Sequence, residues 1–234
     1  MVGFDTSGTM LCSAGNVSTP CEEGEAGVAC EIKITEQGFV LVYSLDIPLV
    51  ANWDQLSDVP YTVDNTASLV GQTIQRIGYL LELDDTYIWV TMNDFTESSD
   101  FSRLGIPTDW IWDKEVEALT VLTNVPNVNA VTLASGGNIE FWSHSYFSGP
   151  DGSFNANDSI SRPDDYGSFQ IHHNGDTLLA YNGWSYTASG ENDNFRFGDV
   201  GIGNSLIFNR TDWTTINNAG DYTTRRLQVY VLLE

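Results

Sequence analysis

Basic residues are scarce in this chain: 9 Lys and Arg stand against 32 Asp and Glu, and the formal net charge is −23. A field this negative repels nucleic acid and anionic membrane surfaces, so neither is expected as a partner. Two compatible explanations of the acidity stay open. One is a solvated acidic surface, which is common in secreted proteins from salty environments. The other is Ca²⁺ binding, because clustered carboxylates supply the oxygen ligands that this cation takes.

Long apolar runs are missing as well. No stretch approaches the roughly 18–20 consecutive apolar residues that a membrane span requires, so membrane insertion is not expected. The first residues carry neither the basic charge nor the apolar run of a signal peptide. Leu233-Glu234 resembles a cloning scar. We therefore expect a module cut from a longer extracellular or cell-surface protein, with the targeting segment elsewhere in that protein.

Signatures of catalysis and of zinc binding are also lacking. The chain has no Gly-x-Ser-x-Gly nucleophile elbow, so a hydrolytic triad is not favoured. Cys12, Cys21 and Cys30 lack the Cys-x-x-Cys spacing and the His partners of a zinc site. One disulfide with one cysteine left over fits an exported protein, and the pairing stays open.

Glycine and aromatic residues, by contrast, are plentiful, with 21 Gly, 7 Trp, 10 Tyr and 11 Phe. This composition favours strands joined by tight turns. About a dozen strand-like runs, and no amphipathic helix of ten residues or more, predict an all-β fold, an antiparallel, jelly-roll-like β-sandwich. The expected strands are Ala29–Thr35, Gly38–Ile47, Tyr61–Asp64, Ile74–Leu83, Tyr87–Met92, Val116–Leu122, Asn129–Leu133, Asn138–Ser143, Gly167–His172, Thr177–Asn182, Val200–Ile202, Leu206–Phe208 and Arg225–Leu232.

The chain shows no internal repeat and no linker that would divide it into several domains. Residues 1–28, rich in Gly, Ser, Thr and Glu, are expected to form a loop-rich N-terminal arm with cysteines. Residues 29–232 are expected to form a single β-sandwich ligand-binding domain, followed by the scar-like residues 233–234.

The first candidate ligand contacts lie in Asn138-Ile139-Glu140-Phe141-Trp142. Strand alternation puts Asn138, Glu140 and Trp142 on one face. In a sugar platform, Trp142 would stack on a pyranose ring while Glu140 accepts hydrogen bonds from hydroxyls. A solvated strand face with an incidental Trp explains the pattern equally well. His172 and His173 are adjacent, so on a strand they point to opposite faces; His172 is expected at the binding surface.

Two further motifs end strands at glycines. Asn182-Gly183-Trp184-Ser185-Tyr186 enters a loop, where Trp184 and Tyr186 offer large contact area at low entropic cost; a Trp184 that caps the core edge is the equal alternative. Asp199-Val200-Gly201-Ile202-Gly203-Asn204 is not a dinucleotide fingerprint, because no helix pattern follows it. Its glycines are expected to allow a tight bend that brings Asp199 and Asn204 to a ligand or ion.

A set of stretches that runs through most of the chain carries a family resemblance. They are Leu41 to Pro48, Pro60 to Asn65, Gly78 to Leu83, Trp89 to Thr96, the motifs around Glu140, His172, Trp184 and Asp199, Asp212-Trp213 and Tyr222 to Val229. From about Gly38 to Val231, the chain resembles a β-sandwich domain found attached to sialate O-acetylesterase-like and other large surface proteins of aquatic bacteria. The resemblance implies a noncatalytic accessory module, most simply a carbohydrate-binding one. A weaker likeness, of acidity and setting, is to the ligand-binding modules of giant calcium-dependent bacterial adhesins.

The sequence therefore predicts a noncatalytic extracellular module that binds carbohydrate with the assistance of Ca²⁺. The partner is a glycan or short peptide on a cell surface, or a polysaccharide. Two alternatives remain: an adhesin module that captures a peptide through Ca²⁺, and an esterase or polysaccharide lyase. The expected ligand contacts are Glu140, Trp142, His172, Asn182, Trp184, Tyr186 and Asn204, and the expected metal ligands are Asp164, Asp165 and Asp199.

Overall fold

The structure is a computed structural model of the 234-residue chain. It describes residues 2–4, 10–12, 33–47, 49–50, 59–96, 101–107, 112–124, 131–133, 135–142, 145–146, 159–160, 168–173, 176–182, 196–197, 199–202 and 221–234. Within these residues strands dominate, and no helix is long and apolar enough to cross a membrane.

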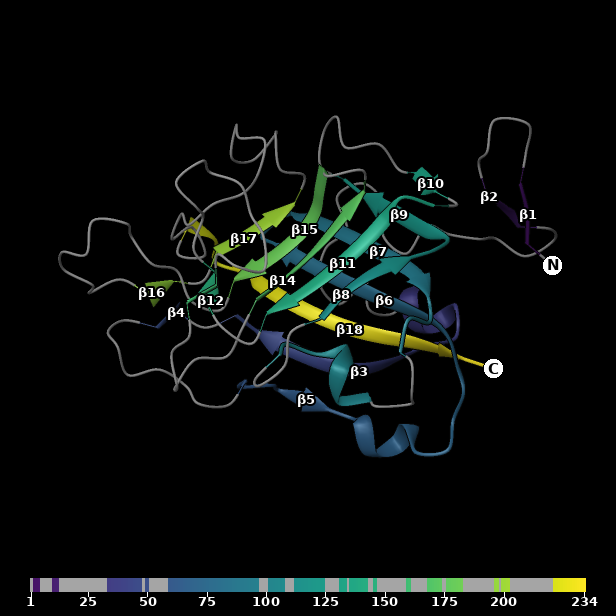
Figure 1. Ribbon diagram of the computed structural model, residues 1–234, viewed down its shortest axis with the longest axis horizontal. Helices are drawn as coiled ribbons and strands as arrows, with labels where there is room; N and C mark the ends of the chain where they lie inside the picture. Colours follow the sequence, from purple (N-terminus) through teal and green to yellow (C-terminus); the bar gives the residue numbers. More distant parts are fainter. Residues whose placement is uncertain are drawn as a thin grey trace.

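Two antiparallel sheets form the body of the fold (Figure 1). The seven-stranded sheet has the order β10-β9-β7-β6-β18-β3-β5. Its strands are β3 (Phe39–Asp46), β5 (Val63–Asp64), β6 (Ile74–Leu83), β7 (Thr86–Asn93), β9 (Leu119–Thr123), β10 (Val131–Leu133) and β18 (Arg225–Leu233). The five-stranded sheet has the order β17-β15-β14-β11-β8. Its strands are β8 (Trp112–Val116), β11 (Gly137–Trp142), β14 (Ser168–His173), β15 (Asp176–Asn182) and β17 (Asp199–Ile202).

Shorter elements complete the described chain. Three two-stranded pairs join β1 (Val2–Phe4) to β2 (Met10–Cys12), β4 (Leu49–Val50) to β16 (Arg196–Phe197), and β12 (Ser145–Tyr146) to β13 (Ser159–Ile160). Two 3₁₀ helices, η1 (Thr66–Leu69) and η2 (Phe101–Leu104), lie in connections. The β1–β2 pair lies to one side of both main sheets in Figure 1.

The hairpin of β6 and β7 shows how the sequence sets the fold. Ile74–Leu83 is mainly apolar, although it contains Gln75, Arg76 and Glu82, and it ends at Asp84-Asp85, where the chain turns. Asp84 has a positive φ of 50°, a conformation that Asp tolerates better than most residues. Its Oδ1 accepts hydrogen bonds from the backbone N–H groups of Thr223 and Thr224, both at 2.8 Å. The turn is thereby fastened to the start of β18.

The main core fills the space between the two sheets, which overlie one another in Figure 1. Tyr79 of β6 contacts Phe169 of β14 with ring centroids 5.3 Å apart, so aromatic packing joins the layers directly. Alternate residues of each strand supply the remaining core, as a half-buried sheet requires. On the five-stranded sheet they are Val116, Ile139, Phe141, Phe169, Ile171, Leu179, Tyr181, Val200 and Ile202.

A second hydrophobic cluster lies on the opposite, outer side of the seven-stranded sheet. Trp89 and Tyr230 are its largest members, and their rings meet edge to face at 5.6 Å. The Trp89 ring lies over Gly78, where any Cβ would come within 2.1 Å of it. Ile34, in a helical turn at residues 33–36, packs into the same cluster and is fully buried. The seven-stranded sheet is therefore buried on both faces.

The prediction of an all-β antiparallel sandwich is confirmed. The strand predicted for Ala29–Thr35 is wrong at its end, because residues 33–36 form the helical turn that delivers Ile34. The single strand predicted for Val116–Leu122 is also wrong. The chain there leaves β8 and enters β9 in the other sheet, turning at Ala118 with φ 52°. The strand predicted for Leu206–Phe208 lies outside the described residues, and the arm predicted for residues 1–28 contains the β1–β2 pair.

Candidate ligand-binding face and corner pocket

The outer side of the five-stranded sheet carries polar residues at consecutive register positions. In one transverse row, Glu115 of β8 pairs with Asn138 of β11, which pairs with His172 of β14. In the next row, Asp113 pairs with Glu140, which pairs with Gln170. On β11 and β14 the residues between them, Ile139 and Ile171, belong to the core, whereas on β8 the intervening residue is Lys114. We name this set, Asp113, Glu115, Asn138, Glu140, Gln170 and His172, the polar face.

Glu140 and His172 are brought together across β11 and β14. They occupy diagonal positions on the same face, and Nε2 of His172 lies 3.3 Å from Oε2 of Glu140. The contact becomes an ion pair when the imidazole is protonated. Beside it, the Asn138 amide donates a hydrogen bond to Oδ1 of Asp113. Carboxylate, amide and imidazole groups thus lie within one small area, a combination that can both donate to and accept from ligand hydroxyls.

Exposure falls across the polar face from β8 inward. Asp113 and Glu115 are exposed, whereas the side chains of Glu140 and His172 are 21% and 12% exposed and Gln170 is fully buried. The open platform expected around Glu140 is therefore half-buried. Its accessible part lies on the β8 and β11 side.

Register places three more of the predicted contacts on this face. Trp142 pairs with Ser168, Ser168 with Asn182, and Asn182 with Asp199, which forms a third transverse row beside Glu140. The structure describes the strand positions of these residues and not their side chains. Trp184, Tyr186, Asn204, Asp164 and Asp165 lie outside the described residues, so their predicted roles stay predictions.

The paired histidines behave differently from one another. His172 shares the outer face with Glu140 and Gln170, while His173 follows it at the strand end, opposite Asp176. The pairing of β14 with β15 shifts by one residue between Ile171 and His172. A bulge at this point re-aims the end of the strand, a common feature near binding sites.

Within the described part of the chain, no group of three or more His, Cys, Asp or Glu side chains is arranged to hold a metal ion. The described residues therefore do not fit a calcium site, and no step is assigned to the ion. The calcium prediction depends on Asp164, Asp165 and Asp199, which are outside the described residues or described by strand position alone.

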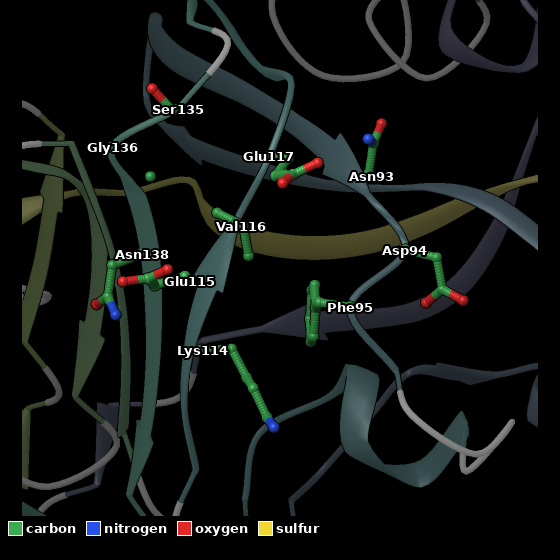
Figure 2. Close-up of a pocket in the computed structure, with 11 residues that line it drawn as sticks. Asn93, Asp94, Phe95, Lys114, Glu115, Val116, Glu117, Ser135, Gly136 and Asn138 are labelled. Atoms are coloured by element: carbon green, nitrogen blue, oxygen red, sulfur yellow. The ribbon is translucent and has the colours of Figure 1, made fainter.

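A pocket of about 690 Å³ adjoins the polar face where β7 ends and β8 begins its crossing to β9 (Figure 2). We name it the corner pocket. Its lining comes from three segments, Asn93-Asp94-Phe95, Lys114 to Glu117 and Ser135 to Asn138. Glu115 and Asn138 belong to both the pocket and the polar face, so the two surfaces are continuous.

Backbone and arginine contacts fix the walls of the corner pocket. The backbone N–H of Asn93 donates to the carbonyl of Glu117 at 3.0 Å, which ties the end of β7 to the crossing. Arg76 donates to Oδ1 of Asn93 at 3.2 Å and to the carbonyl of Ala118 at 2.8 Å. Burial lowers the pKa of the Arg76 guanidinium. The sequence reasoning missed this pocket, although the alternating acids Asp113, Glu115 and Glu117 were a visible signal.

In comparisons with family models, curated proteins and solved structures, nothing matches the chain. The resemblance noted in the sequence therefore stays a prediction, and the functional argument depends on the polar face and the pocket.

Proposed function

We propose that this chain is a noncatalytic carbohydrate-binding domain that holds a glycan along the polar face of its five-stranded sheet. The observation that carries the proposal is the sheet register. It brings Glu140 and His172 to 3.3 Å and puts the positions of Trp142, Asn182 and Asp199 on the same face. Five positions from four separate motifs thus share one surface.

The chemistry of the polar face suits sugar hydroxyls. A hydroxyl donates one hydrogen bond and accepts others, so a carboxylate beside amide and imidazole groups can satisfy neighbouring hydroxyls of one ring. Glu140 and His172 are held on adjacent strands of a sheet whose other face is packed core, and rigid strands position a site better than loops do. An apolar surface for ring stacking would come from Trp142, and from Trp184, which follows β15 in the sequence.

The proposed setting is extracellular or at a cell surface, with the domain as one module of a larger protein. The resemblance to accessory domains of bacterial surface proteins and the net charge of −23 support this setting. Calcium assistance belongs to the same proposal, with Asp164, Asp165 and Asp199 as ligands. If a structural ion is bound, EDTA should lower the melting temperature, and an unchanged value would contradict tight binding.

The test is a glycan array probed with and without Ca²⁺, followed by titration of any hit with variants of the polar face. Glu140→Gln and His172→Ala should each weaken binding about tenfold, because each removes a group that contacts hydroxyls in a half-buried site. The control is Glu36→Gln, which removes an exposed carboxylate on the helical turn of residues 33–36.

Three results would contradict the proposal. The first is an array without hits, and the second is equal affinity in the wild type and both polar-face variants. The third is turnover of acetylated or uronic-acid substrates, which would favour an esterase or lyase. Capture of short peptides in place of glycans, in a parallel peptide library, would favour an adhesin module instead.

A further inference from the structure

The corner pocket has the size and position of a second subsite. Its volume, about 690 Å³, is in the range of small-molecule sites. Among the described residues, its lining includes Asn138 from the motif of Glu140 but neither Glu140 nor His172. The pocket continues the polar face through Glu115 and Asn138, so a ligand that lies across Glu140 and His172 can extend into it.

One side of the pocket is apolar and firmly held. Val116 is buried, and the half-buried ring of Phe95 meets the rings of Trp112 at 5.8 Å and of Phe141 at 6.1 Å. Gly137 packs closely against this wall, because a Cβ there would lie 2.9 Å from a methyl of Val116 and 3.0 Å from the Val116 carbonyl. The pocket therefore offers a preformed apolar surface against which one face of a sugar ring can pack.

The polar lining of the pocket is mainly anionic. Figure 2 shows Asp94, Glu115 and Glu117 around it, and Lys114 is the one basic residue among the described residues of the lining. Oδ1 of Asp94 is fixed by the N–H and hydroxyl of Thr96, at 2.8 and 2.6 Å. The ammonium of Lys114 lies 4.6 Å from the centroid of the Trp112 ring, in a cation–π contact.

Charge in the pocket selects the ligand class. Three carboxylates against one ammonium, in a chain of net charge −23, disfavour uronic acids and other anionic sugars. A protonated amine gains charge-assisted hydrogen bonds from the same carboxylates. We propose that the corner pocket is a subsite for an amine-bearing sugar unit, the terminal residue of a glycan chain held on the polar face. This inference rests on the proposed function.

The experiment compares two oligosaccharides of equal length on the full chain by calorimetric titration. One is the hexamer of glucosamine and the other is the hexamer of N-acetylglucosamine, at a pH where the free amines are protonated. The wild type should bind the amine form about tenfold more tightly. Because the attraction is electrostatic, this preference should shrink as salt is raised.

The decisive variant is the double change Glu115→Gln with Glu117→Gln, which should abolish the preference for the amine form. Its matched control is Glu36→Gln with Asp85→Asn, which removes two exposed carboxylates elsewhere and changes net charge equally. The control variant should keep the preference for the amine form. This result would distinguish an effect of the pocket carboxylates from an effect of the protein's net negative charge.

The outcomes distinguish the two proposals. Equal binding of both hexamers by the wild type, or an unchanged preference in the Glu115 and Glu117 variant, would overturn the pocket subsite and leave the proposed function standing. If the Glu115 and Glu117 variant and the Glu36 and Asp85 variant both lose the preference for the amine form, the preference depends on net charge, and the subsite proposal is also overturned. Failure of both hexamers to bind, while other glycans bind on the array, would reject the amine-bearing class alone. No glycan binding at all would reject both proposals.

Discussion

The outer faces of the two sheets carry similar polar residues in different environments. On the seven-stranded sheet, Glu82 is fully buried, and its Oε2 accepts two hydrogen bonds from Arg226, at 2.8 and 2.7 Å. On the five-stranded sheet, Glu140 faces His172 at 3.3 Å, and both side chains stay partly exposed. Each face thus has an acid beside a basic group on the neighbouring strand, but the Glu82 side chain is 1% exposed and the Glu140 side chain is 21% exposed.

Burial decides what each pair can do. A buried carboxylate must keep its partner, because an unpaired charge in the interior costs several kcal/mol. Glu82 shares the outer face of its sheet with the buried rings of Tyr87, Trp89 and Tyr230, so we expect its pair with Arg226 to contribute to stability. The side chains of Glu140 and His172 are partly exposed, although Oε2 of Glu140 and Nε2 of His172, the two atoms that face each other, are buried. The comparison therefore predicts that mutations will affect folding on one face and binding on the other.

The largest expected effect comes from Arg226→Ala. This change leaves the Glu82 carboxylate buried without its two charge-assisted hydrogen bonds, and we expect a loss of about 3 kcal/mol in the free energy of unfolding. Urea denaturation, monitored by Trp fluorescence, measures it. Glu140→Gln, at a half-buried position of the other outer face, is the control and should change stability by less than about 1 kcal/mol.

A double variant makes the same test sharper. Replacing both partners, Glu82→Leu with Arg226→Met, removes the buried charge together with its partner and should recover most of the stability. The comparison of the two faces fails if Arg226→Ala is no more destabilising than Glu140→Gln.

The next effect concerns Gly78→Ala on the seven-stranded sheet. The new methyl would lie 2.1 Å from the Trp89 ring, which Phe39 and Tyr230 hold edge-on at 5.2 and 5.6 Å. Because the ring is buried and cannot swing aside, we expect a loss of about 2 kcal/mol, seen as a lower urea midpoint. In the alanine background, Trp89→Leu should cost less than it does alone, since it relieves the clash. Additive losses would show that the outer cluster is loosely packed.

Much of the fold follows from local pattern. The apolar run of β6, the turn at Asp84-Asp85 and the strand after it are all visible in the sequence, and the structure has them. The sequence did not predict that the chain passes from one sheet to the other at Ala118, because Val116–Leu122 reads as one uninterrupted strand. The break depends on the contact of Arg76 with the Ala118 carbonyl, from a residue 42 positions away. Likewise Ile34 adopts a helical turn because it packs on the outer cluster.

The candidate site was predictable in part. Alternation alone groups Asn138 with Glu140, but pairing Glu140 with His172 needs the register between β11 and β14. The sequence pattern could not predict how exposed each acid is, because Glu82 and Glu140 both lie between apolar neighbours on a strand. Whether such an acid is closed off or open depends on what packs on the outer face, which is a tertiary property.

The smallest expected effect is at a position in the core, which serves as a reference because it lies on neither outer face. Tyr79 lies in the core between the sheets, and its hydroxyl donates to the Leu104 carbonyl at 2.9 Å. Tyr79→Phe should cost about 1 kcal/mol near neutral pH.

The contribution of Tyr79 to stability is expected to depend on pH in the alkaline range. Burial first, then the neighbouring phenols of Tyr61 and Tyr43, raise the pKa of Tyr79 well above its ordinary value of 10.0. Folding therefore favours the neutral phenol: its stabilising contribution is present in full below pH 10.0 and is lost as pH rises toward the raised pKa of the folded state. The stability gap between wild type and Tyr79→Phe, measured by urea denaturation, should narrow above pH 10.0. A gap that stays constant with pH would mean that the hydroxyl reaches solvent, and the core would then not be the closed reference against which the two outer faces are compared.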